Sequence, residues 1–387
     1  MRPRRIRRWV PVLGAFAALG LVASVSTAVA DARRGEPLQW VVLGDSYTAG
    51  AIPAASSKPG GRLNDPPHFR DGAVGAETRS GCDQTDLSYP YRVDAALGEK
   101  GEGLVKLTAN VSCGGAQIKH IQAERQTPYG QNIPGLSKPD HLFFPTDPDA
   151  DATSLAFPKV ERVQLDAVTG DTRLVTVGIG GNSLGFAPII AKCMELGAAT
   201  GDEGAPCSAH FTEASADVET ITRRLERVAA EYRVMLDQIK AKAHPEAKIL
   251  AIGYPFIIPE DDQISRCMWG RPEENLISLH HFASVTHDDL RWLRDSVLKP
   301  LNSVIAQAAA DEGAHFVDLY GLGAPGHHVC GQTGVGQDEA WVEGLIDQHV
   351  YVPVITRWPR GALVHPNAKG HEQAATAVIA KIRELLT

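Results

Sequence analysis

Short apolar runs recur along the chain, and they show little alternation between apolar and polar positions. A strand that is buried on both faces has this pattern, which is typical of a parallel sheet covered by helices. The runs have the length of ordinary strands. We expect five strands from the segments LQWVVLG, GLVKLTAN, RLVTVGI, AKILAIG and AHFVDL, at residues 38–44, 103–110, 173–179, 247–253 and 314–319.

Helical patterns lie between or after these runs, with apolar residues at steps of three and four. Such spacing places the apolar side chains on one face of a helix. Alternation of strands and helices predicts an α/β fold with right-handed crossovers: a flavodoxin-like three-layer α/β/α sandwich around a parallel five-stranded sheet. The three apolar faces are Val218, Ile221, Leu225, Val228, Tyr232, Leu236 and Ile239; Leu290, Leu293, Val297, Leu301, Val304 and Ala308; and Ala375, Val378, Ile379, Ile382 and Leu386.

Four long stretches without such patterns separate the predicted elements, at residues 51–90, 127–158, 255–287 and 324–360. They are rich in Gly, Pro and polar residues. Irregular segments of this length within a compact domain are usually functional or tied down by cross-links. We find no linker composition that would divide the chain, so residues 31–387 are expected to form a single catalytic domain.

The first 30 residues have the composition of a signal peptide. The segment MRPRRIRRWV supplies five Arg and no acidic residue, and the apolar run PVLGAFAALGLVASV follows it. Small residues at Ala28 and Ala30 predict cleavage after Ala30. An uncleaved anchor is the alternative, but the apolar run is short for a membrane span. We therefore expect an exported, extracellular protein.

Loss of residues 1–30 makes the balance of charge more acidic. The whole chain has 38 Lys and Arg against 46 Asp and Glu, and the mature chain would keep 33 basic residues, a net charge of −13. Nucleic acid is an improbable partner for such a protein. No later segment is long and apolar enough to predict a membrane span. We expect a monomer without an integral span after cleavage.

Six cysteines occur in the chain, at Cys82, Cys113, Cys193, Cys207, Cys267 and Cys330. An even number in an exported protein predicts disulfides, although six cysteines allow 15 pairings. Pairing in sequence order is one of these. A zinc site is the alternative, and the chain lacks the CxxC spacing that would favour it.

Polar residues suited to acyl transfer follow several of the predicted strands. In an open parallel sheet, sites form beyond the carboxyl ends of the strands. The first strand ends at Asp45-Ser46, the second is followed by ANVSCGGA, and the third by GIGGNSLGF, while LVHPNAKGH precedes the last helix. A serine needs a base such as histidine to act as a nucleophile. Glycine turns and an asparagine amide are suitable donors to an oxyanion.

The segments GDSY, SCGGA, GGNS and HPNAKGH resemble, in this order, the sequence blocks of the SGNH hydrolases, also called GDSL-type esterases and lipases. The blocks extend from Gly44 to His371, over nearly the whole mature chain. Further segments, GHHVCG and AWVEGL, resemble the secreted actinobacterial lipase branch, whose cysteines pair in sequence order. The resemblance thus implies the disulfides Cys82–Cys113, Cys193–Cys207 and Cys267–Cys330.

The resemblance also implies the roles of the residues that match each block. Ser46 would be the nucleophile and His365 the general base. The oxyanion hole would consist of the backbone N–H groups of Ser46 and Gly115 and the side-chain amide of Asn182. Asp45 would hold the turn by hydrogen bonds. No cofactor is implied.

Two positions depart from the family pattern. Ser183 stands where the third block usually has aspartate. Many members also place an aspartate three residues before the histidine, and Ala362 occupies that position here. The backbone carbonyl of Ala362 is then expected to orient His365, as in a few members of this branch. A distant acid, Asp347 or Asp338, is the alternative.

These observations predict a secreted serine esterase or lipase that acts on carboxylic esters, with lipid acyl esters as the expected substrates. An O-acetyl esterase of cell-wall or plant polysaccharide is an alternative within the same chemistry. A non-catalytic carbohydrate- or surface-binding protein on the same fold is a third possibility, which the presence of Ser46, Asn182 and His365 disfavours. The His280-His281 and His327-His328 pairs lack HExxH spacing, so we expect no catalytic metal.

Overall fold

The computed structural model divides the chain into two units, Met1–Pro37 and Leu38–Thr387, and the second unit contains the fold. None of the helices in the part of the chain that is described is both long and apolar enough to cross a bilayer. The structure describes residues 36–50, 82, 84–126, 162–213, 215, 217–271, 281–322, 327–328, 330, 340–342, 344 and 364–386.

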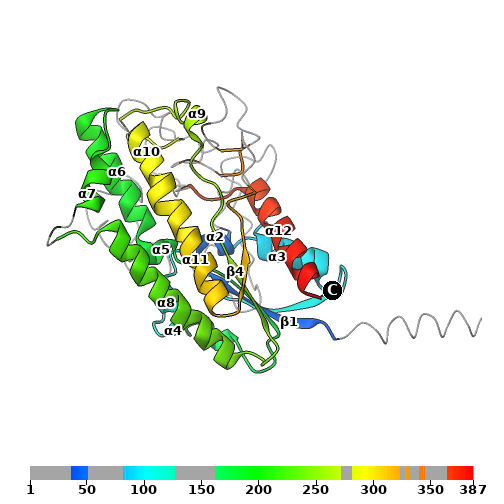
Figure 1. The fold of residues 1–387 in the computed structure, drawn as a ribbon. Helices are drawn as coiled ribbons and strands as arrows, with labels where there is room; N and C mark the ends of the chain where they lie inside the picture. Colours follow the sequence, from blue (N-terminus) through cyan, green and yellow to red (C-terminus); the bar gives the residue numbers. More distant parts are fainter. Residues whose placement is uncertain are drawn as a thin grey trace, which may run out of the picture. The chain divides into compact units, whose positions relative to one another are not determined.

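A parallel sheet of five strands, in the order β2-β1-β3-β4-β5, forms the centre of the fold (Figure 1). All neighbouring strands pair in parallel, which confirms the sheet predicted from the apolar runs. Because β2 and β3 lie on opposite sides of β1, the carboxyl ends of β1 and β3 form a topological switch point, where ligands bind in such sheets. The strands are β1 Leu38–Gly44, β2 Val105–Asn110, β3 Leu174–Gly178, β4 Lys248–Ile252 and β5 His315–Val317.

The side chains of β1 enter two separate cores, one on each face of the sheet. Val41 and Leu43 belong to the larger cluster, and Trp40 and Val42 belong to the smaller one. Each of these four side chains is at most 1% exposed. Burial of an apolar side chain of this size contributes about 1.5–3 kcal/mol. Burial on both faces explains why the strand is apolar without alternation.

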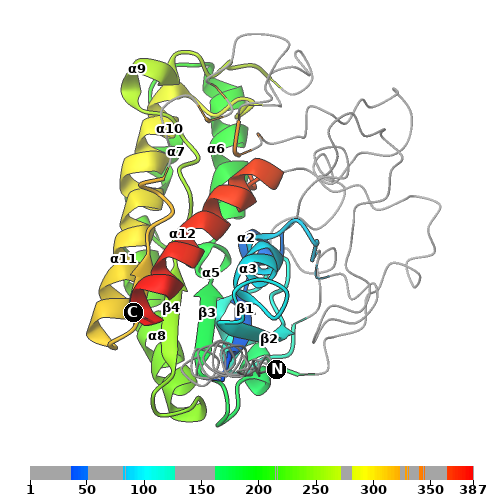
Figure 2. The same ribbon diagram turned by 90° about the vertical axis from the view of Figure 1, so that its right-hand side faces the viewer.

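Two pairs of long helices cover the sheet. The helices α8 (Ile221–Lys242) and α11 (Lys299–Asp311) contact each other on the face of the larger core. On the opposite face α3 (Tyr89–Leu97) packs against α12 (Ala368–Leu386), and Figure 2 shows this pair in front of the sheet. The three-layer sandwich is therefore confirmed. The three predicted apolar helix faces lie in α8, the α10–α11 segment and α12, except for Val218, which precedes α8.

Further helices connect these elements, and several of them begin at residues that follow a strand. In the α10–α11 segment, a single rod runs from His287 to Asp311 with one π-helical stretch, η3, in its middle. These helices are α2 Ser46–Ala49, α4 Ile118–Gln122, η1 Gln164–Ala167, α5 Gly181–Leu184, α6 Phe186–Thr200, α7 Pro206–Thr212, α9 Asp261–Ile264, α10 His287–Trp292 and η3 Leu293–Leu298.

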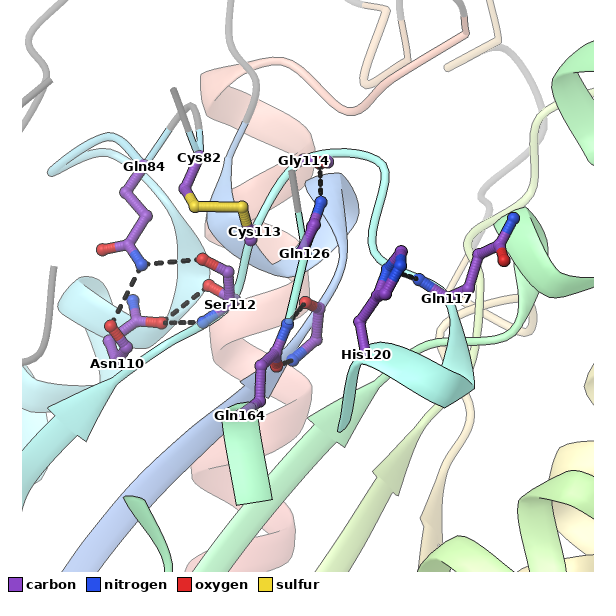
Figure 3. The surroundings of a disulfide bond; sticks show 11 residues. Cys82, Gln84, Asn110, Ser112, Cys113, Gly114, Gln117, His120, Gln126 and Gln164 are labelled. Atoms are coloured by element: carbon purple, nitrogen blue, oxygen red, sulfur yellow. Dashed lines mark hydrogen bonds between the residues drawn. A yellow bond between two sulfur atoms is a disulfide. The ribbon is translucent and has the colours of Figure 1, made fainter. Parts of the chain in front are cut away.

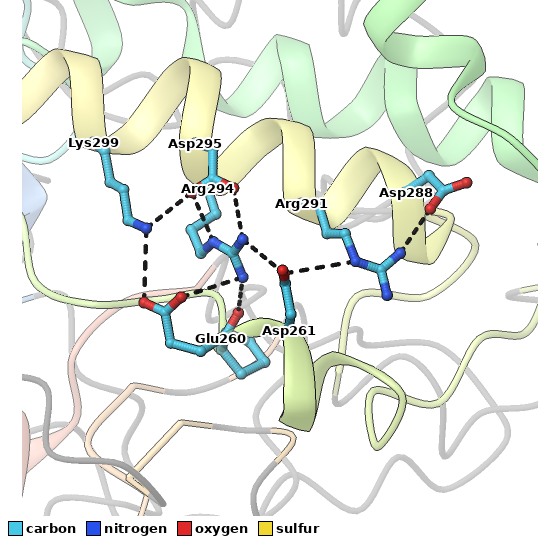
Figure 4. Close-up of polar contacts among 8 residues, drawn as sticks. Glu260, Asp261, Asp288, Arg291, Arg294, Asp295 and Lys299 are labelled. Atoms are coloured by element: carbon cyan, nitrogen blue, oxygen red, sulfur yellow. Dashed lines mark hydrogen bonds and ion pairs between the residues drawn. The ribbon is translucent and has the colours of Figure 1, made fainter.

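The π-helical stretch carries an arginine that ties this rod to the segment after β4 (Figure 4). The guanidinium of Arg294 donates to the carbonyl oxygen of Pro259 at 2.8 Å, and it pairs with Asp261 at 2.8 Å and Asp295 at 2.6 Å. The Arg294 side chain is only 4% exposed. A buried charge is costly unless it is paired, so separation of α9 from η3 would leave the Arg294 guanidinium without some of its partners. The network therefore holds α9 against η3.

Three disulfides cross-link the loops. They join Cys82 to Cys113, Cys193 to Cys207, and Cys267 to Cys330. These are the three pairs that sequence order and the family resemblance implied. Every one of the six side chains is buried. The first disulfide attaches the end of one long loop to the turn after β2, and the third joins two loops 63 residues apart in the sequence.

Candidate active site

Backbone hydrogen bonds bring the turns after β1, β2 and β3 together. The amide of Cys113, after β2, donates to the carbonyl oxygen of Gly44 at 3.0 Å, and the amide of Asp45 donates to the carbonyl oxygen of Gly178 at the end of β3, also at 3.0 Å. The side chain of Gln164 accepts from the Gly44 amide at 2.8 Å and donates to its carbonyl oxygen at 2.9 Å. The turn after β1 is thus fixed between the turns that follow its two neighbours.

A glycine is required where β1 ends. A Cβ atom on Gly44 would lie 2.4 Å from the hydroxyl oxygen of Thr48 and 2.7 Å from the carbonyl oxygen of Gly178. Only a residue without a side chain permits this close approach. Helix α2 follows immediately, with Asp45 as its N-cap and Ser46 as its first residue. The local sequence therefore places the serine hydroxyl at the switch point of the sheet.

Ser46 and His365, which are 319 residues apart in the sequence, are in hydrogen-bond contact at this point. The distance between Oγ of Ser46 and Nε2 of His365 is 2.6 Å. Both side chains are half-buried. A hydroxyl that contacts an imidazole nitrogen at this distance can pass its proton to the ring as it attacks an electrophile.

Tyr47 contacts the same histidine from the neighbouring position of α2. Its hydroxyl donates to the carbonyl oxygen of Val364 at 2.7 Å, and its ring centroid lies 4.6 Å from that of His365, with 32° between the ring planes. Val364 has a φ of 60°, in the left-handed region that a β-branched residue rarely adopts. The amide of Val364 also donates to Gly344 at 2.9 Å, so contacts on both sides hold this conformation.

The segment that carries His365 is anchored by the start of α12. The side chain of Asn367 accepts from the backbone amides of Lys369 and Gly370, at 3.0 and 3.1 Å, and it donates to the carbonyl oxygen of Ala340 at 2.6 Å. An asparagine in this arrangement caps a helix. The capped end of α12 therefore fixes the backbone two residues after the histidine.

Asp45 is buried and accepts two hydrogen bonds. One carboxylate oxygen accepts from the amide of Tyr47 at 2.9 Å, and the other accepts from the hydroxyl of Tyr254 at 2.5 Å. The same hydroxyl of Tyr254 accepts from the amide of Gly181 at 2.7 Å. Burial raises the pKa of the Asp45 carboxyl to about 7, against the opposing effect of these hydrogen bonds. Tyr254 thus connects the serine turn to α5.

The two predicted oxyanion-hole turns also contact each other. The side-chain amide of Asn182, in α5, donates to the carbonyl oxygen of Ala116 at 3.0 Å, one residue after Gly115. The hydroxyl of Ser183 accepts from the amide of Ile118 at 2.9 Å. Ser183, at the position where the family pattern has aspartate, therefore contributes a second bond between the turns. Gly115 has a φ of 75°, which a glycine adopts without strain.

A buried polar cluster shapes the turn that carries Gly115 (Figure 3). Asn110 accepts from the amide and the hydroxyl of Ser112, at 3.2 and 2.6 Å, with its side-chain oxygen. The Gln84 amide donates to the carbonyl oxygens of both residues, at 3.0 and 2.8 Å. The Cys82–Cys113 disulfide lies directly beside this cluster. Side chains and a cross-link together fix a turn that has no regular secondary structure.

A pocket adjoins this site at the carboxyl ends of β3 and β4. Its empty volume, together with the space open to solvent, is about 650 Å³. Apolar and aromatic side chains predominate in its walls. Tyr47 forms part of the wall, and Pro366, next to His365, forms another part. Trp341 and His327 also contribute, with their rings stacked at a centroid distance of 4.1 Å.

Some expectations from the sequence lie outside the residues that the structure describes. Ala362, whose carbonyl was expected to orient the histidine, is one of them, and so are the alternative acids Asp347 and Asp338. Their part in the site stays a prediction. Among the residues that are described, no cluster of three His, Cys, Asp or Glu side chains suits a metal ion.

The fold and the site together define a class of protein. The sheet is flavodoxin-like, and Ser46 at its switch point contacts His365, which precedes the last helix. Residues 42–373 match the model of the GDSL-like Lipase/Acylhydrolase family. The chain therefore belongs to this family, and it is a carboxylic ester hydrolase.

Relatives in Streptomyces agree with this assignment. An esterase from Streptomyces scabiei is 31% identical over 396 residues, which cover 99% of this chain and 95% of the relative. Lipase 2 of Streptomyces coelicolor is 28% identical over 362 residues, or 92% and 90% of the two chains. The crystal structure of phospholipase A1 from Streptomyces albidoflavus is similar with a TM-score of 0.51 and 19% identity, covering 89% of this chain and 98% of that one, which supports the fold.

Several residues that build the site were not singled out from the sequence. Tyr47 was overlooked although it belongs to the GDSY block, because the block was interpreted through its aspartate and serine alone. Tyr254 is the second residue after β4, so the position of a residue at a strand end is a signal that points to it. Gln164 gives no such signal, because a lone glutamine in an irregular segment does not reveal that it will bond to Gly44.

Proposed function

We propose that the protein hydrolyses lipid acyl esters through an acyl-enzyme on Ser46, with His365 as the general base. The observation that carries this proposal is the 2.6 Å contact between Oγ of Ser46 and Nε2 of His365 at the switch point of the sheet. The names of two similar proteins, a lipase and a phospholipase A1, favour lipid esters as the substrate class.

The reaction would proceed in two halves. His365 takes the proton of Ser46 as Oγ attacks the ester carbonyl carbon, and the imidazolium then protonates the alcohol that leaves. In the second half, His365 takes a proton from water as the water attacks the acyl-enzyme. The imidazolium then returns this proton to Oγ of Ser46 as the carboxylic acid leaves. Each half passes through a tetrahedral oxyanion.

The oxyanion would be stabilised by the backbone N–H groups of Ser46 and Gly115 and by the side-chain amide of Asn182. Support comes from the backbone bonds that fix the β1 turn between its neighbours, and from the bond between Asn182 and Ala116. Donors that are held in place before the reaction need no reorganisation during it. Loss of one such donor typically costs about 2.7–4 kcal/mol of transition-state stabilisation.

We also propose that the protein is secreted, with cleavage after Ala30. The N-terminal pattern of arginines and apolar residues supports this, and so do three disulfides, which persist in oxidising compartments. Mass spectrometry of the protein from culture medium should find a chain that begins at Asp31. A chain that retains Met1 and stays with the cells would overturn the proposal.

The nucleophile is tested by labelling with a fluorophosphonate and by mutation. Peptide mass spectrometry should find the adduct on Ser46, and Ser46→Ala should lower kcat for p-nitrophenyl butyrate by at least about 10⁴-fold. Ser303→Ala, on the exposed side of α11, is the matched control and should leave kcat unchanged. If the folded protein takes no label and turns over no ester, the proposal fails.

The substrate class is tested with a panel of esters. We expect turnover of p-nitrophenyl esters of graded chain length and of a phospholipid, and slower turnover of an acetylated sugar. A preference for the acetylated sugar over every acyl ester longer than butyrate would replace lipid esters by polysaccharide acetate as the substrate class.

A further inference from the structure

Two residues that line the pocket beside Tyr47 have a buried polar atom without a hydrogen-bond partner, Oη of Tyr89 and Nε2 of His371. His371, in the first turn of α12, lines the pocket and is only 1% exposed. Its Nδ1 accepts a hydrogen bond from the backbone amide of Tyr89 at 3.3 Å. Its Nε2 is buried and has no hydrogen-bond partner.

The bond from Tyr89 fixes which nitrogen of His371 carries the proton. A backbone amide can only donate, so Nδ1 must be unprotonated and the neutral ring carries its proton on Nε2. Burial, with a smaller contribution from the charge of Arg92, lowers the pKa of His371 to about 3, so the ring is neutral at physiological pH. Nε2–H is therefore a buried donor without an acceptor. Native proteins leave few such groups unpaired, and the acceptor can come from a ligand when the group belongs to a residue that lines a cavity.

The walls of the pocket limit what could supply the acceptor. Ile252, Phe256, Leu319 and Val342 are among the apolar residues that line it, and no Lys, Arg, Asp or Glu is among the described lining residues. A carboxylate or phosphate placed here would lose its hydration without a compensating charge. A pocket of this size with apolar walls and few polar groups has the usual character of a small-molecule site.

We propose that this pocket binds the alkyl chain of a neutral lipid whose ester carbonyl or hydroxyl oxygen accepts a hydrogen bond from Nε2–H of His371. The identification of the occupant as a lipid rests on the proposed function. Neither Ser46 nor His365 is among the described lining residues, but Tyr47 contacts His365 and lines the pocket. The occupant thus lies beside the reacting carbonyl and is separated from the catalytic histidine by one aromatic ring.

Binding is tested directly in the Ser46→Ala variant, so that no turnover occurs. Isothermal titration or saturation-transfer NMR would compare 1-octanol, 1-chlorooctane and octanoate, which share a chain and differ in the terminal group. We expect 1-octanol to bind about threefold to tenfold more tightly than 1-chlorooctane, the effect of one neutral hydrogen bond, and octanoate to bind more weakly than either. Equal binding of octanol and chlorooctane, or no binding of either, would overturn the proposal.

Two variants locate the binding in this pocket. His371→Phe keeps the ring and removes the donor, so it should abolish the preference for octanol over chlorooctane. His244→Phe, at the opposite end of β4, is its matched control. Gln373→Trp, which fills the pocket from its partly exposed wall, should weaken both ligands at least tenfold, and Glu372→Trp, on the next residue of α12, should not.

A spectroscopic measurement keeps the test independent of how well these variants fold. In the Ser46→Ala protein, the Nε2–H proton resonance of His371 should move downfield when 1-octanol is added and should not move with 1-chlorooctane. An unshifted resonance at saturating octanol would contradict the proposed hydrogen bond. None of these readouts depends on ester hydrolysis, so a failure of the catalytic proposal and a failure of this one are distinguishable.

An experiment with the active enzyme decides whether the alkyl chain in the pocket belongs to the substrate or to a separate lipid molecule. If the pocket holds a second chain of the substrate itself, 1-octanol should inhibit hydrolysis of dioctanoylglycerol competitively and leave p-nitrophenyl acetate unaffected. If it holds a separate lipid molecule, 1-octanol should change both rates by the same factor. Inhibition of p-nitrophenyl acetate alone would place octanol over Ser46 and overturn the proposal.

Discussion

The hydroxyl of Tyr47 donates a 2.7 Å hydrogen bond to the carbonyl oxygen of Val364. This bond connects the segment that carries Ser46 to the segment that carries His365. Tyr47 directly follows Ser46, and Val364 directly precedes His365. The ring of Tyr47 also lies against the imidazole, at a centroid distance of 4.6 Å. The residue after the proposed nucleophile therefore holds the segment of the proposed base.

The two contacts of Tyr47 can be separated by mutation. Tyr47→Phe removes the bond to Val364 but keeps the ring, and we expect kcat to fall about 2- to 10-fold with KM unchanged, the effect of one neutral hydrogen bond. Tyr47→Leu also removes the aromatic face. Because that face stabilises an imidazolium, the acid limb of the kcat/KM profile should move to lower pH in Tyr47→Leu and stay in place in Tyr47→Phe. Steady-state kinetics between pH 5 and 9 measure both effects.

Tyr232→Phe is the control for these variants, since it removes a buried hydroxyl that has no hydrogen-bond partner. It should leave kcat and the pH profile as in the wild type. If Tyr47→Leu only lowers the melting temperature, with kcat and pH profile unchanged, Tyr47 has a purely structural role.

A distant carboxylate is the alternative support for His365. If Asp347 held the ring, Asp347→Asn would lower kcat by about 10⁴-fold, as expected for an acid that fixes the tautomer of a catalytic histidine. With support from the backbone and Tyr47, we expect Asp347→Asn and Asp338→Asn each to keep kcat within about threefold. Ala362→Gly should also keep most of the activity, because it retains the carbonyl. A large loss in either aspartate variant would identify the missing acid.

Tyr254 connects the serine turn to the turn that carries Asn182. Tyr254→Phe would leave the Asp45 carboxylate and the Gly181 amide without this buried partner, and each such loss costs about 1–3 kcal/mol. We expect the free energy of unfolding to fall by about 2–4 kcal/mol in denaturant titrations. The apparent kcat should fall by more than the unfolded fraction of the variant accounts for, with little change in KM. The reason is that Asn182, a proposed oxyanion donor, directly follows Gly181. Unchanged kcat in the folded variant would show that Asn182 does not depend on this bond.

The sheet and its helices could be predicted because burial leaves a strong mark on sequence. A strand such as β1 must be apolar at every position when both faces enter a core, as Trp40 to Leu43 do. The helix faces follow for the same reason. The order β2-β1-β3-β4-β5 was not predicted, because pairing partners leave no comparable local signal in the sequence.

The site was predictable only where its residues follow a strand or belong to a recognisable block. Ser46 meets both conditions and His365 meets the second, and the structure places them in contact. The residues that hold Ser46 and His365 in place were not predictable from the sequence. Gln164 and Gln84 bond to the backbone of distant turns, and His371 is buried although it lies in the first turn of α12. Such bonds depend on the tertiary arrangement, and the residues that make them have no characteristic spacing.

The disulfides should contribute to stability in the order of the loops that they close. The chain-entropy model gives about 3 kcal/mol for the separation of 14 residues between Cys193 and Cys207, and about 4 kcal/mol for the separation of 63 between Cys267 and Cys330. Double Cys→Ala variants, titrated with denaturant, should lose these amounts of unfolding free energy. Reduction of the wild-type protein should lower its melting temperature. An unchanged melting temperature, with six titratable thiols, would show that the bonds do not form.

Asp45 should make the protein less stable as the pH rises from about 4 to about 7. Burial raises the pKa of its carboxyl from 3.8 to about 7 in the folded protein, so between these values the folded state binds a proton that the unfolded state has released. The stabilisation from this proton is then complete below pH 4 and is lost as the pH rises through 7. At 1.36 kcal/mol for each pKa unit, the loss in unfolding free energy is about 4 kcal/mol. Denaturant titrations at pH 4, 5, 6, 7 and 8 would measure how the unfolding free energy depends on pH.

Two variants isolate the contribution of Asp45 to this pH dependence. In Asp45→Asn, which does not titrate, this contribution should disappear, whereas Asp318→Asn, at an exposed turn, should keep it. If the wild type and Asp45→Asn lose stability in parallel over this range, the carboxyl is already ionised in the folded protein at pH 4, and the hydrogen bonds from Tyr47 and Tyr254 outweigh its burial.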